Sequence, residues 1–294
     1  MTEKDHSHRF TFEESAVRGE IVQLKHSYNA VIAKHDYPGV VEELVGEFLS
    51  AVALLSSTIK FKGTLSLQVR GDGAIKMLVA ECRDQSTLRA VATFDESIPA
   101  DSLEIDRQAL FGNAQLAITI EPHKGQSYQG IVSLSEQCLS KALEDYFLQS
   151  EQLPTRIWLS SDAKGQTAAG LMIQSLPASA DQSQLSLNSE DWERITMLSQ
   201  TITDEELLSL EPEQLLLRLY HEEGVRLHPS KELAFGCSCS RARVANSLLT
   251  IGREETERAL EASDDEIKID CHFCRARYLF TRDDVEELFA QKVH

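Results

Sequence analysis

The sequence predicts an α+β fold in three parts. Strand and helix patterns are mixed over residues 1–178, as expected of an N-terminal core domain with a mixed sheet. A stretch rich in Ser, Gln and Asp over 178–189 opens an acidic, partly helical linker, which spans 179–230. Residues 231–294 form a small C-terminal module with four of the six cysteines. A chain of 294 residues also exceeds a typical single domain, which agrees with this division.

The first elements are a strand, a helix and a hairpin. Alternating residue types over 9–24 predict a strand. Pro38 precedes a helix whose apolar residues recur at helical spacing: Val40, Val41, Leu44, Val45, Phe48, Leu49 and Val52. Strand patterns at 64–70 and 74–83 flank Gly71-Asp72-Gly73, which predicts a tight turn between them.

The second half of the core domain repeats the mixture of strands and helices. Ser133 and Glu136 have the spacing of a capping box and predict a helix that runs through Phe147. Four further strands are predicted at 115–121, 128–132, 156–160 and 168–176. Pro177 then ends the pattern.

The linker has short amphipathic helices. Thr203 and Glu206 form a second capping box, and Pro212 starts another helix that ends near Gly224. The apolar faces consist of Leu207, Leu208, Leu210, Leu215, Leu216, Leu219 and Tyr220. Residues 179–230 also hold 11 acidic and 3 basic side chains. Because such short helices are marginal alone, we expect the N-terminal sheet and the C-terminal module to cover their apolar faces.

The C-terminal module places its cysteines in a CxC…CxxC pattern. Helices are predicted at 240–249 and 254–262, a hairpin at 267–271 and 276–280, and a last helix to about 291, capped by Thr281 with Asp284. The four cysteines are Cys237, Cys239, Cys271 and Cys274. Four thiolates at such short spacings can converge on one tetrahedral ion, and zinc is the best fit. The sequence therefore predicts one zinc ion in a small zinc-binding module.

The same spacings allow disulfides within each pair. Zinc-bound thiolates can be oxidised when an oxidant reaches them. A structural zinc contributes about 10–16 kcal/mol to the folding of a small domain, whose core alone supplies about 3–5 kcal/mol. Oxidation is therefore expected to unfold the module and to loosen the linker, which exposes apolar surface beside negative charge. Such a surface suits a protein that binds unfolded proteins.

Composition excludes several classes of protein. The net charge of −18 argues against binding to nucleic acid or to an anionic membrane. No segment approaches 18 continuous apolar residues, and the first ten residues lack an apolar signal core, so we expect a cytoplasmic protein. Free thiols in a reducing compartment favour a metal site or a switch over permanent disulfides. No P-loop, HExxH or triad spacing occurs, so no enzyme is predicted.

The chain resembles the heat shock protein 33 family of redox-regulated, zinc-binding holdase chaperones over almost its whole length. The resemblance is most specific in FGCSCS (235–240) and CHFCRARYLF (271–280). Weaker matches are Arg18-Gly19, Tyr37-Pro38, KFKG (60–63), YQG (128–130), SEQLPT (150–155) and AAGLMIQSLP (168–177).

The resemblance implies a cytosolic, ATP-independent chaperone that is inactive when reduced and zinc-bound. It implies that the four family ligands are Cys237, Cys239, Cys271 and Cys274, and that oxidation forms the disulfides Cys237–Cys239 and Cys271–Cys274. Peroxide under unfolding conditions, or hypochlorous acid, then releases the zinc and unfolds the module and the linker. The active form is expected to be a homodimer that binds unfolding clients and passes them to ATP-dependent foldases.

Two alternatives remain beside this interpretation. Arg241, Arg243, Arg253, Arg275 and Arg277 near the cysteines favour a zinc-ribbon protein that binds nucleic acid. A catalytic zinc would make the protein a metalloenzyme, but four sulfur ligands leave no position for water. For the remaining candidate residues, we expect Cys82 and Cys138 to be buried structural thiols and His272 to be solvated.

Overall fold

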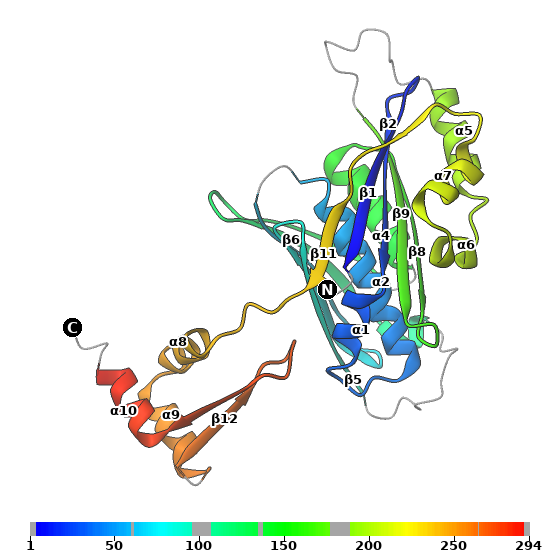
Figure 1. The fold of residues 1–294 in the computed structure, drawn as a ribbon. Coiled ribbons are helices and arrows are strands. Elements are labelled where there is room, and N and C mark those ends of the chain that lie inside the picture. Colours follow the sequence, from blue (N-terminus) through cyan, green and yellow to red (C-terminus); the bar gives the residue numbers. More distant parts are fainter. Residues whose placement is uncertain are drawn as a thin grey trace. The chain divides into compact units, whose positions relative to one another are not determined.

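The computed structural model describes residues 4–59, 62–95, 107–134, 138–176, 189–263 and 265–290. The chain divides into two compact units, 1–236 and 237–294. Both contain strands and helices (Figure 1), which confirms the predicted α+β class with a small C-terminal module. Nearly all of the predicted stretch 178–189 lies outside the described residues.

The first unit is built on one long sheet. Its strands are β1 (Asp5–Phe12), β2 (Val17–Leu24), β3 (Gly63–Arg70), β4 (Ile75–Arg83), β5 (Thr87–Phe94), β6 (Gln115–Pro122), β7 (Tyr128–Ser133), β8 (Thr155–Asp162), β9 (Thr167–Ser175), β10 (Val225–Leu227) and β11 (Lys231–Phe235). They follow the order β7-β6-β3-β4-β5-β11-β1-β2-β9-β8, and β10 pairs with β1 beside this path. Strand β11 runs parallel to β5 and antiparallel to β1. It therefore joins two antiparallel half-sheets, one from β7 to β5 and one from β1 to β8.

The helices of the first unit are α1 (His26–Ile32), α2 (Gly39–Ser56), α3 (Arg107–Phe111), α4 (Leu139–Tyr146), the π-helical turn η1 (Phe147–Glu151), α5 (Ser189–Ser199), α6 (Asp204–Ser209) and α7 (Pro212–Tyr220). The second unit contains α8 (Arg241–Ile251), α9 (Arg253–Glu261), β12 (Glu266–Asp270), β13 (Arg277–Thr281) and α10 (Arg282–Ala290). No helix among the described residues is long and apolar enough to cross a bilayer.

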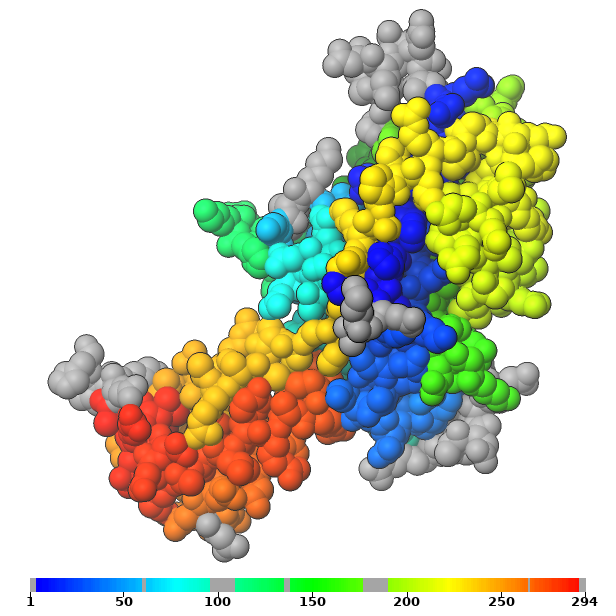
Figure 2. Space-filling model, viewed as in Figure 1, coloured from blue at the N-terminus to red at the C-terminus, as the bar shows by residue number. Residues whose placement is uncertain are grey.

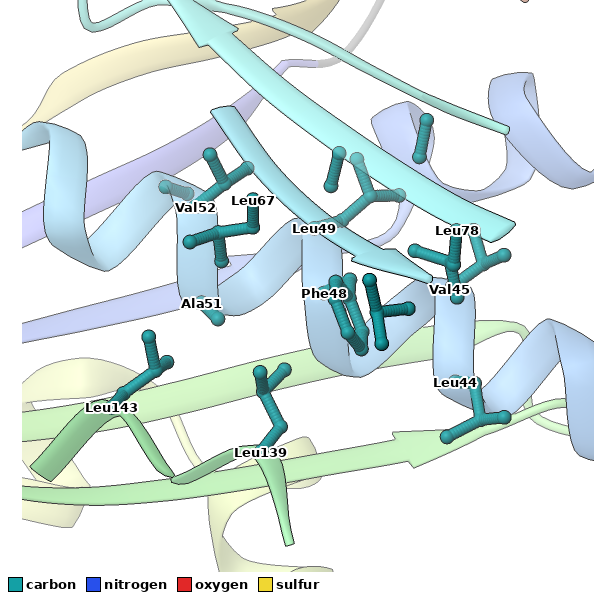
Figure 3. Packing of buried hydrophobic residues seen from close by; sticks show 14 of the residues in the cluster. Leu44, Val45, Phe48, Leu49, Ala51, Val52, Leu67, Leu78, Leu139 and Leu143 are labelled. Carbon is teal, nitrogen blue, oxygen red and sulfur yellow. The ribbon is translucent and has the colours of Figure 1, made fainter. Parts of the chain in front are cut away.

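Helix α2 fills the space between the two half-sheets. It begins directly after Pro38, as predicted, and every apolar residue of its predicted face is buried. It contacts strands of both half-sheets, namely β2, β8 and β9 on one side and β3, β4 and β5 on the other. Figure 3 shows Phe48 and Leu49 among Leu67, Leu78 and Leu139. A helix that is apolar on nearly all sides is stable only in such an interior position.

Three predictions differ from the structure in the N-terminal region. Residues 9–24 form no single strand, because polar residues at 13–15 interrupt the pattern and the chain folds back from β1 to β2. The helix predicted from Ser133 begins at Leu139, and Glu136 of the predicted capping box lies outside the described residues. Strand β5 was not predicted, although it pairs with β4 along its whole length.

The linker helices cover the outer face of the second half-sheet. Alternate residues of β2 point to opposite faces: Val22 and Leu24 pack on the α2 side, whereas Val17 and Ile21 pack on the other. The second group forms one cluster with Leu207, Leu215, Leu216, Leu219 and Tyr220. Figure 1 shows α5, α6 and α7 on this side of the strands, and Figure 2 shows their yellow-green surface beside blue β1. The expected cover from the N-terminal sheet is therefore confirmed.

Specific contacts position these helices. The ring of Tyr220 lies 5.9 Å from Phe10 and 5.0 Å from Phe12, and its hydroxyl is 2.7 Å from Ser199 Oγ. The Gln23 side chain donates hydrogen bonds to the Leu207 and Leu210 carbonyls, at 3.1 and 2.7 Å. The predicted capping box of Thr203 and Glu206 is present at the start of α6.

The end of the linker belongs to the sheet of the first unit. Strand β10 pairs with β1 through Val225–Leu227, and β11 pairs with both β1 and β5. The compact division at 236/237 therefore falls six residues after the predicted boundary at 230/231. The assignment of separate functional roles to the three parts stays a prediction.

The packing of α7 on the sheet predicts unequal effects of two leucine substitutions. Leu215 is fully buried, and Leu215→Ala should destabilise the docked linker by about 2–5 kcal/mol because it leaves a cavity. The exposed neighbour Leu217, 68% accessible, is the matched control, and Leu217→Ala should change stability by less than about 0.5 kcal/mol. Amide hydrogen exchange over α6 and α7 measures both effects. Equal protection in the two variants would show that the cluster does not hold the linker.

Candidate metal centre

The four clustered cysteines come from two segments of the second unit. Cys237 and Cys239 lie in the extended segment before α8, and Cys271 and Cys274 lie in the turn between β12 and β13. All four Sγ atoms lie within 4.8 Å of one another. Two contacts join the segments, at 3.7 Å between the sulfurs of Cys237 and Cys271 and at 3.3 Å between those of Cys239 and Cys274. The predicted convergence of these thiols is therefore present in the fold.

Local backbone geometry presents the second pair. The Arg275 amide donates to the Cys271 carbonyl at 2.8 Å, and the Cys271 amide donates to the Ala276 carbonyl at 2.9 Å. Arg275 adopts φ of 58°, a left-handed conformation that turns the chain sharply after Cys274. The pairing of Asp270 with Arg277 closes the hairpin, and their side chains form an ion pair at 2.7 Å. The turn thus directs both sulfurs to one side.

The CxC segment is positioned by the helix that follows it. Ser240 caps α8 by accepting a hydrogen bond from the Arg243 amide at 3.2 Å, so the helix starts directly after Cys239. A small apolar core holds this helix against the hairpin: Leu248, Leu260, Ile267, Phe280, Val285 and Phe289. Arg241 stacks over the Phe280 ring at 4.3 Å and pairs with Asp284 at 2.8 Å. Thr281 accepts a hydrogen bond from the Asp284 amide, as the predicted last cap requires.

The donor set fits a tetrahedral ion with soft ligands. Four sulfurs at zinc–sulfur distances of about 2.3 Å lie about 3.8 Å apart in a tetrahedron, compared with 3.7 and 3.3 Å for the two sulfur pairs that join the segments. The cysteines are half-buried, which shields the site while leaving it reachable. Cys237, Cys239, Cys271 and Cys274 could therefore hold one zinc ion without rearrangement of the module.

The environment keeps the thiols of Cys271 and Cys274 protonated when no cation is present. Burial raises the pKa of Cys271, and it raises the pKa of Cys274 to about 12 with a further contribution from the neighbouring thiols. Backbone amides oppose this shift, from Phe273 and Cys274 at Cys271 and from Ala276 at Cys274. A bound cation would favour the thiolate over the thiol, because metal binding displaces the thiol protons. These amides would then stabilise the thiolates.

A tyrosine hydroxyl contacts the first cysteine pair. Tyr278 donates a hydrogen bond to Cys239 Sγ at 3.1 Å, and this bond raises the tyrosine pKa to about 12. The hydroxyl therefore stays a donor at neutral pH. Sequence reasoning missed this contact. A signal was present, because Tyr278 and Phe280 share one face of β13 and Phe280 packs in the core of the module. Such contacts around a metal tune ligand basicity and metal affinity.

The remaining candidate residues lie outside the cluster. Cys82 is fully buried in β4, as predicted, and burial raises its pKa to about 11. Cys138 is only half-buried and precedes α4, where its Sγ lies 3.1 Å from Ser140 Oγ. His272 is exposed and is not part of the thiol cluster.

The arginines that favoured nucleic-acid binding have acidic or polar partners. Arg241 pairs with Asp284, Arg253 with Glu257 at 2.6 Å, and Arg277 with Asp270. Arg243 hydrogen-bonds to Ser238. The charges of Arg241, Arg253 and Arg277 are thus paired with carboxylates within the module, which weakens the case for a phosphate-binding surface.

Comparison with known proteins places the chain among chaperones. A family model described as "Hsp33 protein" matches residues 5–281. A "33 kDa chaperonin" of Pseudomonas aeruginosa (strain LESB58) is 47% identical over 291 residues, which cover 99% of this chain and 96% of that protein. A "33 kDa chaperonin" of Nitrosococcus oceani is 45% identical over 293 residues, which cover 100% and 97%. The crystal structure of a 33 kDa chaperonin (heat shock protein 33 homolog) from Thermotoga maritima has the same fold, with a TM-score of 0.83 at 22% identity over 98% of this chain and 99% of that one.

Removal of one clustered thiol should loosen the module without any oxidant. Cys271→Ser should lower the zinc content and make the chain near residue 230 more sensitive to protease, because a three-sulfur site holds the ion less tightly. Cys138→Ser, outside the cluster, is the control and should match the parent protein. Zinc analysis with limited proteolysis under reductant measures both. Parental zinc content and protease resistance in Cys271→Ser would contradict the assignment.

Loss of the tyrosine hydroxyl should weaken zinc retention without removing a ligand. Tyr278→Phe deletes the hydrogen bond to Cys239 and should lower zinc affinity roughly tenfold, as for other contacts around metal ligands. Competition with a chromophoric chelator measures the affinity. Tyr128→Phe in the first unit makes the same chemical change away from the thiols and should leave the affinity unchanged. If both variants retain zinc equally, the hydroxyl has no role at the site.

Proposed function

The chain belongs to the Hsp33 family of chaperones, and from this premise we propose that it is a redox-regulated, ATP-independent holdase. The observation that supports this proposal is the four-thiol cluster of a module with a small apolar core. In the proposed resting state the protein is reduced, metal-loaded and inactive. In the active state it is oxidised and binds unfolding proteins, which prevents their aggregation.

Cys237, Cys239, Cys271 and Cys274 are the proposed ligands of one zinc ion. When bound, zinc would hold all four sulfurs as thiolates and cross-link the CxC segment to the hairpin. The six buried residues of the module core are few, and a core of this size supplies about 3–5 kcal/mol against about 10–16 kcal/mol from a structural zinc. The folded state of the module would therefore depend on the site.

Oxidation would convert the four ligands into two disulfides, Cys237–Cys239 and Cys271–Cys274, which no longer bind the ion. Each disulfide forms as two thiolates give up two electrons, and peroxide takes these with two protons and leaves as two waters. Hypochlorous acid accepts the same two electrons with one proton and leaves as chloride and water. A disulfide between residues i and i+2 spans Cα atoms near the upper limit of about 7 Å and needs local bending. The oxidised segment would thus oppose the compact fold of the module.

Strand β11 connects the linker to the module along the chain, so that unfolding of the module can affect the linker. Cys237 follows Gly236, whose amide donates to the Leu88 carbonyl at 3.0 Å at the last contact of this strand with β5. Only two residues of β11 pair with β5 and three pair with β1. Unfolding of the module would allow this short strand to fray, and the docked helices α5–α7 would follow. Their leucines and the sheet face beneath them would then be available to clients.

The chemistry of this surface suits unfolded polypeptides. The newly exposed cluster would include Phe10, Phe12 and Tyr220, which are large apolar groups in an acidic chain of net charge −18. Negative charge would keep the complex with a client in solution. By resemblance to the family, the active form would be a cytoplasmic homodimer that passes clients to ATP-dependent foldases.

The switch predicts a difference between two redox states of one protein. Reduced, zinc-loaded protein should fail to suppress light scattering by a chemically denatured client enzyme. Protein treated with hypochlorous acid should suppress it at near-stoichiometric ratios, with release of one zinc ion and loss of four free thiols per chain. Cys138→Ser should behave as the parent. Equal protection by the reduced and oxidised forms would rule out the switch and leave only the chaperone activity.

A further inference from the structure

A cavity of about 170 Å³ lies between the two half-sheets, at the end of α2. Its walls are largely apolar and come from both half-sheets, from α2 and from the segment around η1. The apolar lining consists of Leu55, Ile59, Leu65, Ile118, Phe147 and Leu153. A cavity of about 150 Å³ with such a lining can hold a benzene ring. The space therefore accommodates one small apolar group.

An arginine without a counter-ion lines this cavity. Arg18 Nε and Nη2 both donate to a single oxygen, Gln174 Oε1, at 3.2 and 2.6 Å. The Gln174 amide is oriented by its own donation to Thr155 Oγ1 at 3.0 Å. Arg18 makes no ion pair with the part of the chain that the structure describes, and the nearby Glu20 pairs with Arg9 at 3.5 Å. A guanidinium has five N–H donors, so three remain for a ligand.

A buried hydroxyl without a hydrogen bond lines the same cavity. The Tyr146 side chain is 3% exposed, and its Oη has no hydrogen-bond partner among the described residues. Burial raises the pKa of Tyr146, and the nearby Tyr128 hydroxyl and the negative charge of Glu151 raise it further, so the hydroxyl remains protonated. Gly130 of β7 leaves room for this ring, because any side chain there would collide with it. A buried polar group without a partner is costly and needs an explanation.

The backbone beside the cavity departs from regular helix. Helix α4 widens into η1, and Gln152 follows in a left-handed conformation with φ of 56°. This departure places Phe147 and Leu153 in the lining, with the exposed Glu151 at the rim. Single π-helical turns occur frequently at functional sites.

We propose that this cavity binds a small apolar monocarboxylate, such as an aromatic acid with one ring. The two carboxylate oxygens would accept hydrogen bonds from the guanidinium of Arg18 and from the hydroxyl of Tyr146. The ring would fill the space among the apolar side chains. The acid would provide the missing counter-ion of Arg18 and the missing partner of Tyr146 together.

Titration of the reduced full-length protein with benzoate and with benzyl alcohol tests the site. In ¹⁵N-labelled protein, benzoate should shift the amide signals of Leu55, Leu65 and Ile118, and it should bind at least about tenfold more tightly than the neutral alcohol. Equal affinities for the two compounds, or shifts confined to other regions, would overturn the proposal. The reduced protein is used, so the result does not depend on the redox switch.

Two variants identify the donors. Arg18→Gln should lower benzoate affinity at least about tenfold and leave the affinity for benzyl alcohol unchanged. Tyr146→Phe should weaken benzoate binding roughly three- to tenfold. Arg226→Gln removes an exposed arginine of β10, outside the cavity, and should bind benzoate as the parent does. Parental benzoate affinity in Tyr146→Phe or in a folded Arg18→Gln would refute the assignment. If thermal unfolding shows that Arg18→Gln does not fold, the proposal is tested by Tyr146→Phe and by the comparison of benzoate with benzyl alcohol in the parent protein.

Discussion

The second half-sheet has apolar side chains on both of its faces, and this constraint governs the first unit. Strand β9 is buried along nearly its whole length, because Met172 points toward α2 while Leu171 and Ile173 point toward the linker helices. Such a sheet is stable only when both faces are covered. Helix α2 is a permanent cover, since it lies between the half-sheets. The cover of the other face consists of three short helices that have little stability of their own.

This asymmetry between the two covers connects the fold with the proposed function. The linker helices are docked by leucines, by the ring of Tyr220 and by two hydrogen bonds from Gln23, and these leucines and Tyr220 belong to a cluster separate from the core around α2. The core around α2 is much larger than the cluster beneath the linker. A chaperone built in this way could expose one face of its sheet and keep its central core intact. The thiol cluster would supply the chemical signal for that local change.

The sequence predicted features that depend on neighbours in the chain. The buried face of α2, the turn at Gly71-Asp72-Gly73 and the Thr203 capping box follow from spacing alone, and all three are present. The convergence of four thiols was also predictable, because short spacing within each pair leaves only one long-range contact to form. Pairings between distant segments were not predictable. Strands β10 and β11 are three and five residues long, and their partners lie more than 140 residues away in the sequence.

The same limit explains the site features that sequence reasoning missed. The Tyr278 hydroxyl and Cys239 are 39 positions apart, so their contact depends on how the hairpin packs against the CxC segment. Arg18 and Tyr146 line one cavity only because both half-sheets close around the end of α2. Neither residue stands out in composition or periodicity. That Arg18 forms no ion pair and the Tyr146 hydroxyl no hydrogen bond among the described residues becomes visible only in three dimensions.

The position of β1 within the sheet has a consequence for synthesis of the chain. Strand β1 can pair with β2 soon after both are synthesised, but its other edge waits for residues 225–233, which are synthesised much later. Until then the nascent protein carries an open strand edge and an uncovered apolar face, both of which invite association with other chains. A chaperone would thus pass through an aggregation-prone state during its own synthesis.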